Sequence, residues 1–190
     1  MSRVTRVAAG LLCAALLGCS APAEPAAKTA PREESPSQER QAQVRFVHGS
    51  PGHGVPGPWA LAGHRIGLHA LEKLERKRGQ VWGVRFVHRC PQEVRYTCMV
   101  DGLQAATGAS LGKLNLSLEA ASAEELETVV VDAERGLTLR YRLTPSFRER
   151  FYEVDYADFP QAARQLDALP DEEVFEVREE QAPTSRPTAR

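Results

Sequence analysis

The fold is decided by residues 126–143, LETVVVDAERGLTLRYRL. Residues 126–132 contain the apolar run Val129-Val130-Val131, and in residues 137–143 large apolar side chains alternate with threonine and arginine. Alternation with a period of two is typical of a strand that buries one face, and a four-residue turn that ends in glycine joins antiparallel neighbours. The stretch therefore predicts a β-hairpin with one face in the core.

Further strands and helices are expected on both sides of this hairpin. The expected strands lie at residues 44–48, 81–88, 113–118 and 174–177. The expected helices lie at residues 58–78, 98–107, 146–151 and 159–169. Gly63 and Gly67, one turn apart in the first helix, cost helix stability and indicate a close neighbour on that face. Because helices and strands segregate instead of alternating as βαβ units, the predicted class is α+β, with an antiparallel sheet packed with helices.

Composition limits the classes of function. The chain has 190 residues, 42% hydrophobic and 26% charged, which is typical of one globular domain. Its net charge of −1 argues against nucleic acid as a partner, because a nucleic-acid-binding face needs a basic surplus. The apolar runs are shorter than the ~18 residues that a membrane-spanning helix needs.

The N-terminus has the pattern of an export signal. Arg3 and Arg6 precede an apolar run at residues 7–17, and the sequence LLGC at residues 16–19 resembles a bacterial lipobox. This resemblance implies that residues 1–18 are a signal peptide and that Cys19 carries a lipid, whereas the alternative is an ordinary secretory signal with a chance cysteine. The residue after this cysteine is Ser20, whereas an inner-membrane retention signal has an aspartate at that position. We therefore expect a protein anchored in the cell envelope by lipid, in the outer membrane facing the periplasm.

The rest of the chain divides into a tether, a domain and a tail. Residues 19–43 begin with the lipidated cysteine and then lack Leu, Ile, Val and aromatic residues, so they cannot bury enough surface to fold. The folded domain is expected at residues 44–180, and residues 181–190 are interpreted as a disordered tail.

Candidate metal ligands gather in one part of the chain. The five histidines are His48, His53, His64, His69 and His88, and both cysteines of the mature chain, Cys90 and Cys98, follow closely. Imidazole and thiolate are the usual ligands of zinc. No local spacing such as HExxH or CxxC is present, so a metal site would have to be assembled from several elements.

Three of these histidines fall on predicted elements. His64 lies on the apolar stripe of the first helix and His88 on the core face of a strand, and each is either a core histidine or a site residue. His69 is interpreted as a residue of the helix surface.

The two mature cysteines allow two interpretations. In an oxidising compartment Cys90 and Cys98 can form a disulfide that closes a small loop. Alternatively, Cys98 at the start of a helix is a thiolate of low pKa or a metal ligand. The sequence leaves both open.

A family resemblance covers about residues 52–178. Residues 98–116, CMVDGLQAATGASLGKLNL, resemble the central motif of the FmdE family, named for a component of formylmethanofuran dehydrogenase, C-x-x-D-G-[IL]-Q-x-x-T-G-[CA]-[ST]-x-G-K-x-N-[LI]. Residues 53–67, HGVPGPWALAGHRIG, are similar to its H-G-H-x-[CG]-P and G-Y-R-x-G segments. The resemblance implies an α+β core, often dimeric, with a metal site at the motif His and Cys residues.

Carried over by position, the motif residues are His53, Cys98, Asp101, Gln104 and Thr107. Where the family has a second His and two further Cys residues, this sequence has Val55, Gly57 and Ala109. A metal site of the family type therefore loses ligands unless His48, His64 or His88 substitutes. The cytoplasmic reaction of the namesake complex is not expected of an exported lipoprotein.

Two functions follow as hypotheses. In the first, a cleft between the His53 loop and residues 98–112 binds zinc, another divalent metal or a small ligand. Its metal ligands would be His53, His64, His88 and Cys98. Its ligand-binding residues would be His53, His64, Asp101, Gln104 and Thr107.

In the second, the metal site has decayed and the domain is a non-catalytic structural or interaction module stapled by the Cys90–Cys98 disulfide. No nucleophile–base pair is recognisable in the sequence, so no reaction is predicted.

Overall fold

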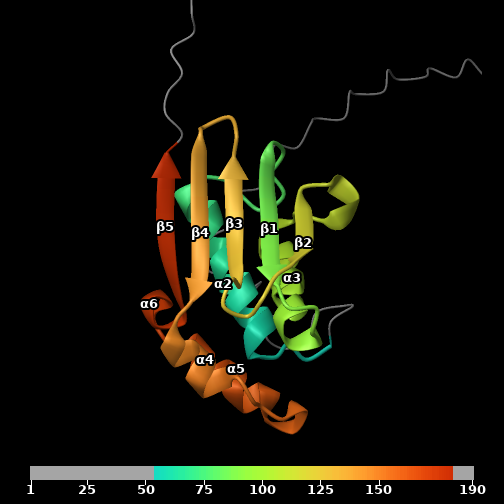
Figure 1. The fold of residues 1–190 in the computed structure, drawn as a ribbon, viewed down its shortest axis with the longest axis vertical. Coiled ribbons are helices and arrows are strands. Elements are labelled where there is room, and N and C mark those ends of the chain that lie inside the picture. Colours follow the sequence, from blue (N-terminus) through green and yellow to red (C-terminus); the bar gives the residue numbers. More distant parts are fainter. Residues whose placement is uncertain (1–53, 182–190) are drawn as a thin grey trace, which may run out of the picture. The chain divides into compact units, whose positions relative to one another are not determined.

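The computed structural model describes residues 54–181, drawn in colour in Figure 1. The expected signal peptide, Cys19, the tether, the strand at residues 44–48 and His53 lie outside the described residues. No helix of the described part is long and apolar enough to cross a membrane.

The centre of the domain is a five-stranded sheet in the order β2-β1-β3-β4-β5. Its strands are β1 Val84–Cys90, β2 Leu116–Ala120, β3 Glu127–Asp132, β4 Leu137–Leu143 and β5 Phe175–Gln181. The predicted hairpin is confirmed as β3 and β4, which pair antiparallel with Val130 opposite Leu139.

One part of the predicted topology is wrong, because the sheet is mixed instead of antiparallel throughout. β1 pairs with β3 antiparallel but with β2 parallel, with Phe86 opposite Leu116. The cause lies in the connection, since α3 (Val94–Thr107) carries the chain back along β1 before β2 begins. A crossover through a helix of this kind joins parallel strands, whereas a tight turn joins antiparallel ones.

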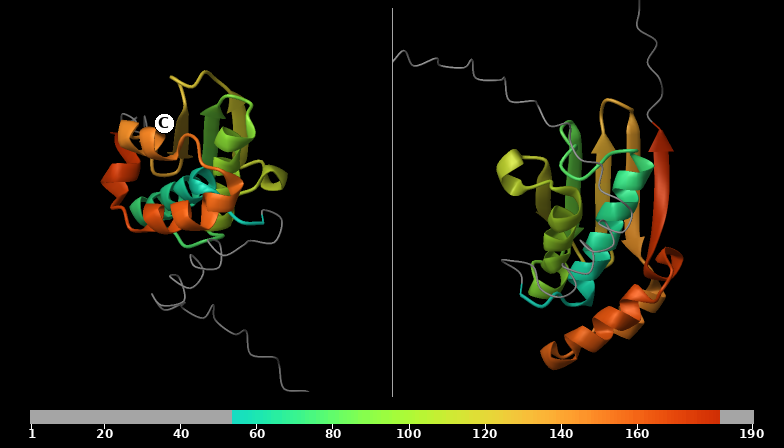
Figure 2. Two further views of the ribbon diagram at one scale, coloured as in Figure 1. Left: turned by 90° about the horizontal axis from the view of Figure 1, so that it is seen from below. Right: turned by 180° about the vertical axis from the view of Figure 1, so that it is seen from behind.

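Two long helices cover one face of the sheet. Figure 2 shows α2 (Pro58–Lys73) and α3 packed side by side on the same side of the strands. The remaining helices are α4 Pro145–Phe151, α5 Phe159–Asp167, α6 Asp171–Val174 and the 3-10 turns η1 Leu111–Lys113 and η2 Tyr156–Asp158. The α+β class is thus confirmed, although α2 ends before the predicted residue 78 and α3 begins four residues before the predicted residue 98.

The close neighbour expected from Gly63 and Gly67 is α3. A Cβ atom at Gly63 would lie 2.1 Å from the backbone oxygen of Met99, and one at Gly102 would lie 1.9 Å from that of Ala60. These glycines therefore bring the two helix backbones into contact. This contact places the first turns of α2 and α3 next to each other.

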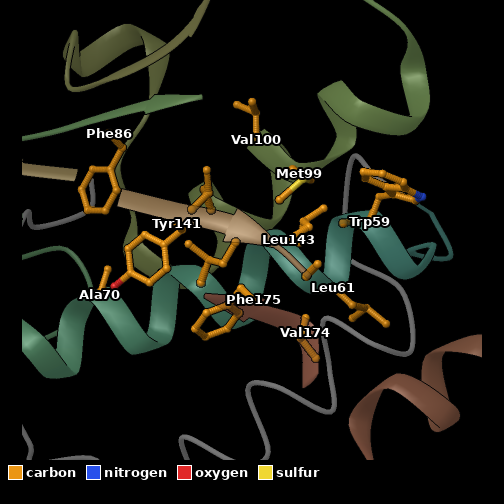
Figure 3. Close-up of a cluster of buried hydrophobic side chains, with 14 of the residues drawn as sticks. Trp59, Leu61, Ala70, Phe86, Met99, Val100, Tyr141, Leu143, Val174 and Phe175 are labelled. Carbon is orange, nitrogen blue, oxygen red and sulfur yellow. The ribbon is translucent and has the colours of Figure 1, made fainter. Parts of the chain in front are cut away.

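The core fills the space between the helices and the sheet. Figure 3 shows Phe86 and Tyr141 of the sheet with Ala70 of α2 and Met99 of α3, all of them buried. The opposite face of the sheet carries ion pairs. There the buried carboxylate of Glu127 lies 3.1 Å from both Arg89 and Arg140.

Candidate functional site

A groove of about 870 Å³ lies at the end of the domain where α2 and α3 begin. One wall is formed by the first turns of these two helices, and the other by α4, α5 and the segment between them. The residues that line it are Gly57, Pro58, Trp59, Ala60, Val94, Arg95, Cys98, Arg150, Phe151, Tyr152, Glu153, Val154, Asp155, Asp158, Phe159, Gln161, Ala162 and Gln165. Figure 1 shows α4 and α5 beyond the ends of the strands, on this side of the domain.

Trp59 joins the two walls. Its indole Nε1 donates a hydrogen bond of 2.9 Å to the backbone oxygen of Phe151. Its ring packs edge-on against Tyr96 and Phe147, with ring centroids 5.0 and 5.3 Å apart. Because Trp59 is buried and its N–H has a partner, it holds the start of α2 against the end of α4.

Arg95 makes the second link across the groove. Its Nη1 donates a hydrogen bond of 2.9 Å to the backbone oxygen of Tyr152, and its guanidinium lies 4.2 Å from the centroid of the Tyr152 ring. Tyr152 also hydrogen-bonds Tyr96, and this bond, aided by burial, raises the pKa of Tyr96 to about 12. Arg95 and the ring of Tyr152 therefore lie together in the groove lining.

Cys98 presents a half-buried thiol to the groove. Burial raises the pKa of this thiol, and the nearby carboxylate of Asp101 raises it further. The structure therefore contradicts the hypothesis of a thiolate with low pKa. The reason is the position of the helix start, because α3 begins at Val94 and Cys98 lies in its second turn, beyond the strongest field of the helix N-terminus.

The predicted disulfide is also wrong, since Cys90 and Cys98 are both free. Cys98 lies one turn before Gly102, the residue of α3 that touches the backbone of α2, so it faces the α2 side. Cys90 ends β1 on the buried face of the sheet, where burial raises the pKa of its thiol to about 11.

His88 is a core residue and does not lie at the edge of the groove. The backbone oxygen of Tyr96 can only accept, so Nε2 of His88, 3.2 Å away, carries the proton. Nδ1 then accepts from the hydroxyl of Thr128 at 2.9 Å. With both nitrogens bound and burial lowering its pKa to about 4, His88 acts as a neutral structural side chain.

The other two described histidines are also structural in position. His64 is buried in α2 outside the groove lining, and burial, with a contribution from the charge of Arg78, lowers its pKa to about 4. The interpretation of His69 as a simple surface residue is wrong, because its Nδ1 lies 2.9 Å from the hydroxyl of Tyr141 and its ring packs against Phe175.

Thr107 and Asn115 build the turn that follows α3. The hydroxyl of Thr107 donates to the backbone oxygen of Leu103 at 2.6 Å and accepts from the N–H of Ala109 at 3.1 Å. Asn115 accepts from the N–H of Ser110 at 3.0 Å and donates to the backbone oxygen of Val81 at 3.2 Å. These two motif residues therefore fix the turn after α3 and join it to the backbone at Val81.

Asp101 and Gln104 are exposed on α3 and are not part of the groove lining. Within residues 54–181, no group of three His, Cys, Asp or Glu side chains is arranged to hold a metal ion. Of the four predicted metal ligands, only Cys98 lines the groove, while His64 lies outside the groove lining, His88 lies in the core and His53 is outside the described residues. The described residues therefore do not fit the metal centre that the family resemblance implies.

Comparison with known proteins identifies the domain. Residues 52–183 match the family model described as FmdE, Molybdenum formylmethanofuran dehydrogenase operon. The chain belongs to the FmdE family. It is also similar to the crystal structure of a tungsten formylmethanofuran dehydrogenase FmdE-like protein from Syntrophus aciditrophicus, with 18% sequence identity, a TM-score of 0.45 and coverage of 76% of this chain and 73% of that chain. No curated protein matches the chain.

Sequence reasoning missed most of the groove in this FmdE domain. Arg95, Trp59 and the segment from Arg150 to Phe159 carry no local metal or catalytic pattern. The one available signal was the presence of five aromatic residues and two arginines in residues 145–159. Only the packing of α4 and α5 against the first turns of α2 and α3 turns these residues into one site.

Proposed function

We propose that this chain is an FmdE-family lipoprotein, anchored through Cys19 in the cell envelope, whose domain binds a small organic ligand in the groove beside Cys98. The groove carries this proposal. Its volume of about 870 Å³ falls within the range of roughly 300–1,000 Å³ that is typical of small-molecule sites. Its first lining residues, Gly57 to Ala60, also follow closely after His53 in the chain, where the family motif begins.

The lining favours a ligand with an apolar body and an anionic group. Trp59, Phe151 and Phe159 supply apolar surface. Within the described residues neither α2 nor α3 has a side-chain cap at its first residue, and the positive ends of both helix dipoles face the groove with Arg95 between them. The other wall carries the carboxylates of Glu153, Asp155 and Asp158 against the single guanidinium of Arg150, and this excess of negative charge directs an anion towards the α2 and α3 side.

A fluorescent probe of this chemistry tests the proposal. The protein is the chain from residue 19 onward with Cys19→Ser, and the probe is 1-anilinonaphthalene-8-sulfonate. We expect the probe to bind at one site per chain and to slow the alkylation of Cys98 by N-ethylmaleimide at pH 8.5. Arg95→Ala should weaken binding about tenfold, in line with the loss of one charge-assisted contact. Arg178→Ala, on an exposed strand far along the chain, serves as the matched control.

The other outcomes separate the competing hypotheses. If the probe neither binds nor protects Cys98, the groove is not a ligand site and the structural or interaction module is the better interpretation. Metal analysis of the same sample tests zinc directly. Zinc bound near one per chain and lost in Cys98→Ser would show that residues before Gly54 complete a metal site, and it would replace the organic ligand as the function.

A further inference from the structure

Three large apolar side chains are exposed together at the opposite end of α3 from the groove. Trp82 is 69% exposed, Leu111 60% and Leu114 89%. The groove lies at the start of α3, whereas these residues lie beside the turn that follows its last residue, Thr107. We call this set the Trp82 surface.

A hydrogen bond and a cation–ring contact show that the two segments of the Trp82 surface are neighbours. Asn115, next to Leu114, donates to the backbone oxygen of Val81, next to Trp82, at 3.2 Å. The ammonium of Lys113 lies 6.0 Å from the centroid of the Trp82 ring. The segments of Trp82 and Leu114 are therefore neighbours, and Lys113, whose ammonium also donates to the backbone oxygen of Gly108 at 2.7 Å, lies beside the Trp82 ring.

Leu114 occupies a costly backbone conformation for an exposed side chain. Its φ is +56°, in the left-handed region that leucine rarely adopts, and it ends η1 by donating its N–H to the backbone oxygen of Leu111. Glycine or asparagine would be easier at this position. A leucine there gains nothing from the core, because almost all of its side chain faces solvent.

The chain segments that carry the Trp82 surface have charges of one sign. Residues 77–85 and 107–118, which build it, contain four cationic residues and no Asp or Glu, although the whole chain has a net charge of −1. The cationic residues are Lys77, Arg78, Arg85 and Lys113. A local excess of this kind is complementary to a surface of negative charge.

We propose that the Trp82 surface docks the domain onto a membrane that contains anionic lipid. Tryptophan is enriched at the lipid–water boundary because its ring is apolar and its N–H remains hydrated. Exposed leucines beside lysine and arginine are the composition of segments that lie in the interface of anionic bilayers. Each side chain contributes little alone, but a chain held at the membrane by a lipid at Cys19 meets the bilayer at high effective concentration.

Vesicle binding tests the proposal in a protein that lacks the lipid anchor, and its readout does not depend on ligand binding in the groove. The chain from residue 19 onward with Cys19→Ser is mixed with vesicles of phosphatidylcholine alone or with 30% phosphatidylglycerol. We expect binding only with phosphatidylglycerol, a blue shift of tryptophan emission, and quenching by lipids brominated along the acyl chain. In the Trp82→Phe variant all tryptophan emission comes from Trp59, which is buried, so the brominated lipids should not quench it.

Two variants and a control make the result specific. Leu114→Asp and Lys113→Glu should each weaken vesicle binding at least fivefold. Tyr156→Asp, equally exposed at 69% but at the groove end, should leave it unchanged. Absence of quenching, or binding that Leu114→Asp does not weaken, would overturn the proposal and make a protein partner the better explanation of the patch. These readouts do not depend on the ligand groove, so failure of one proposal is distinguishable from failure of the other.

Discussion

At the scale of single residues, burial decides what the histidines and cysteines do. His64 and His88 are both enclosed, and burial lowers the pKa of each to about 4 from about 6.5 in the unfolded chain. Each imidazole is therefore neutral in the fold. Cys98 is the one candidate ligand of the described residues that keeps access to the groove.

The buried histidines predict a pH dependence of stability. Because the folded pKa lies below the unfolded one, their contribution is present above about pH 6.5 and is lost as the pH falls towards 4. The free energy of unfolding should decrease by up to about 1.4 kcal/mol per pH unit for each histidine in this window. Urea unfolding at pH 7, 6 and 5 measures the slope. His88→Gln, which keeps a donor for Tyr96, should have a shallower slope than the parent chain, and an equal slope would contradict the assignment.

The free cysteines predict a thiol count. In the chain from residue 19 onward with Cys19→Ser, Cys98 should react with a thiol reagent in the folded state, and more rapidly as the pH rises above 9, because burial and Asp101 raise its pKa. Cys90 has no exposed surface and should react only after unfolding. We expect two reactive thiols per chain in denaturant without reductant. A count of zero would instead show that Cys90 and Cys98 form a disulfide.

At the scale of elements, the contact between α2 and α3 organises the site. Glycines at the crossing let the two helix backbones touch. This contact sets the first turns of α2 and α3 side by side, facing α4 and α5 across the groove. The turn after α3 is held by Thr107 and Asn115 and supports both β2 and the Trp82 surface.

Gly102→Ala should destabilise the domain strongly. The new Cβ would lie 1.9 Å from the backbone oxygen of Ala60, so the helices must separate, at a cost of about 3 kcal/mol or more. Gly112→Ala is the matched control, since a Cβ there has no neighbour within 4 Å. The change in melting temperature measures both variants, and a loss of equal size in the two would refute the close crossing.

At the scale of the whole molecule, the domain has a groove at one end of α3 and a cationic apolar surface at the other. If the Trp82 surface rests on a bilayer, the groove faces away from the lipid towards the solvent. Cys19, the expected site of the lipid, is separated from the described domain in the sequence by the 34 residues from Ser20 to His53.

Removal of the anchor residue tests the envelope proposal. Cys19→Ser removes the thiol that lipid attachment requires, so most of the protein should move from the membrane fraction to the soluble fraction after cell disruption. Cys13→Ser, within the same signal, is the control and should leave the distribution unchanged. A Cys19→Ser protein that remains as membrane-bound as the parent would contradict the lipid anchor.

The sequence by itself determined the local elements of this protein. The alternation in residues 137–143 and the apolar run before it specify the hairpin, because a period of two puts one face of a strand in the core whatever surrounds it. The motif at residues 98–116 was sufficient to indicate the FmdE family, and its last part builds a turn in which Thr107 bonds Leu103 and Asn115 bonds Ser110.

Only the tertiary structure decided which residues form a site. Arg95 and Tyr152 are separated by 57 positions, and Trp59 and Phe151 by 92, and no local pattern records such contacts. The roles of His88 and Cys98 also depended on packing. The strand period places His88 on the inner face, but only the pairing with β3 and the packing of α3 show that Thr128 and Tyr96 bind its two ring nitrogens. Local sequence determines which backbone forms, whereas burial and long-range contact determine which side chains remain available for chemistry.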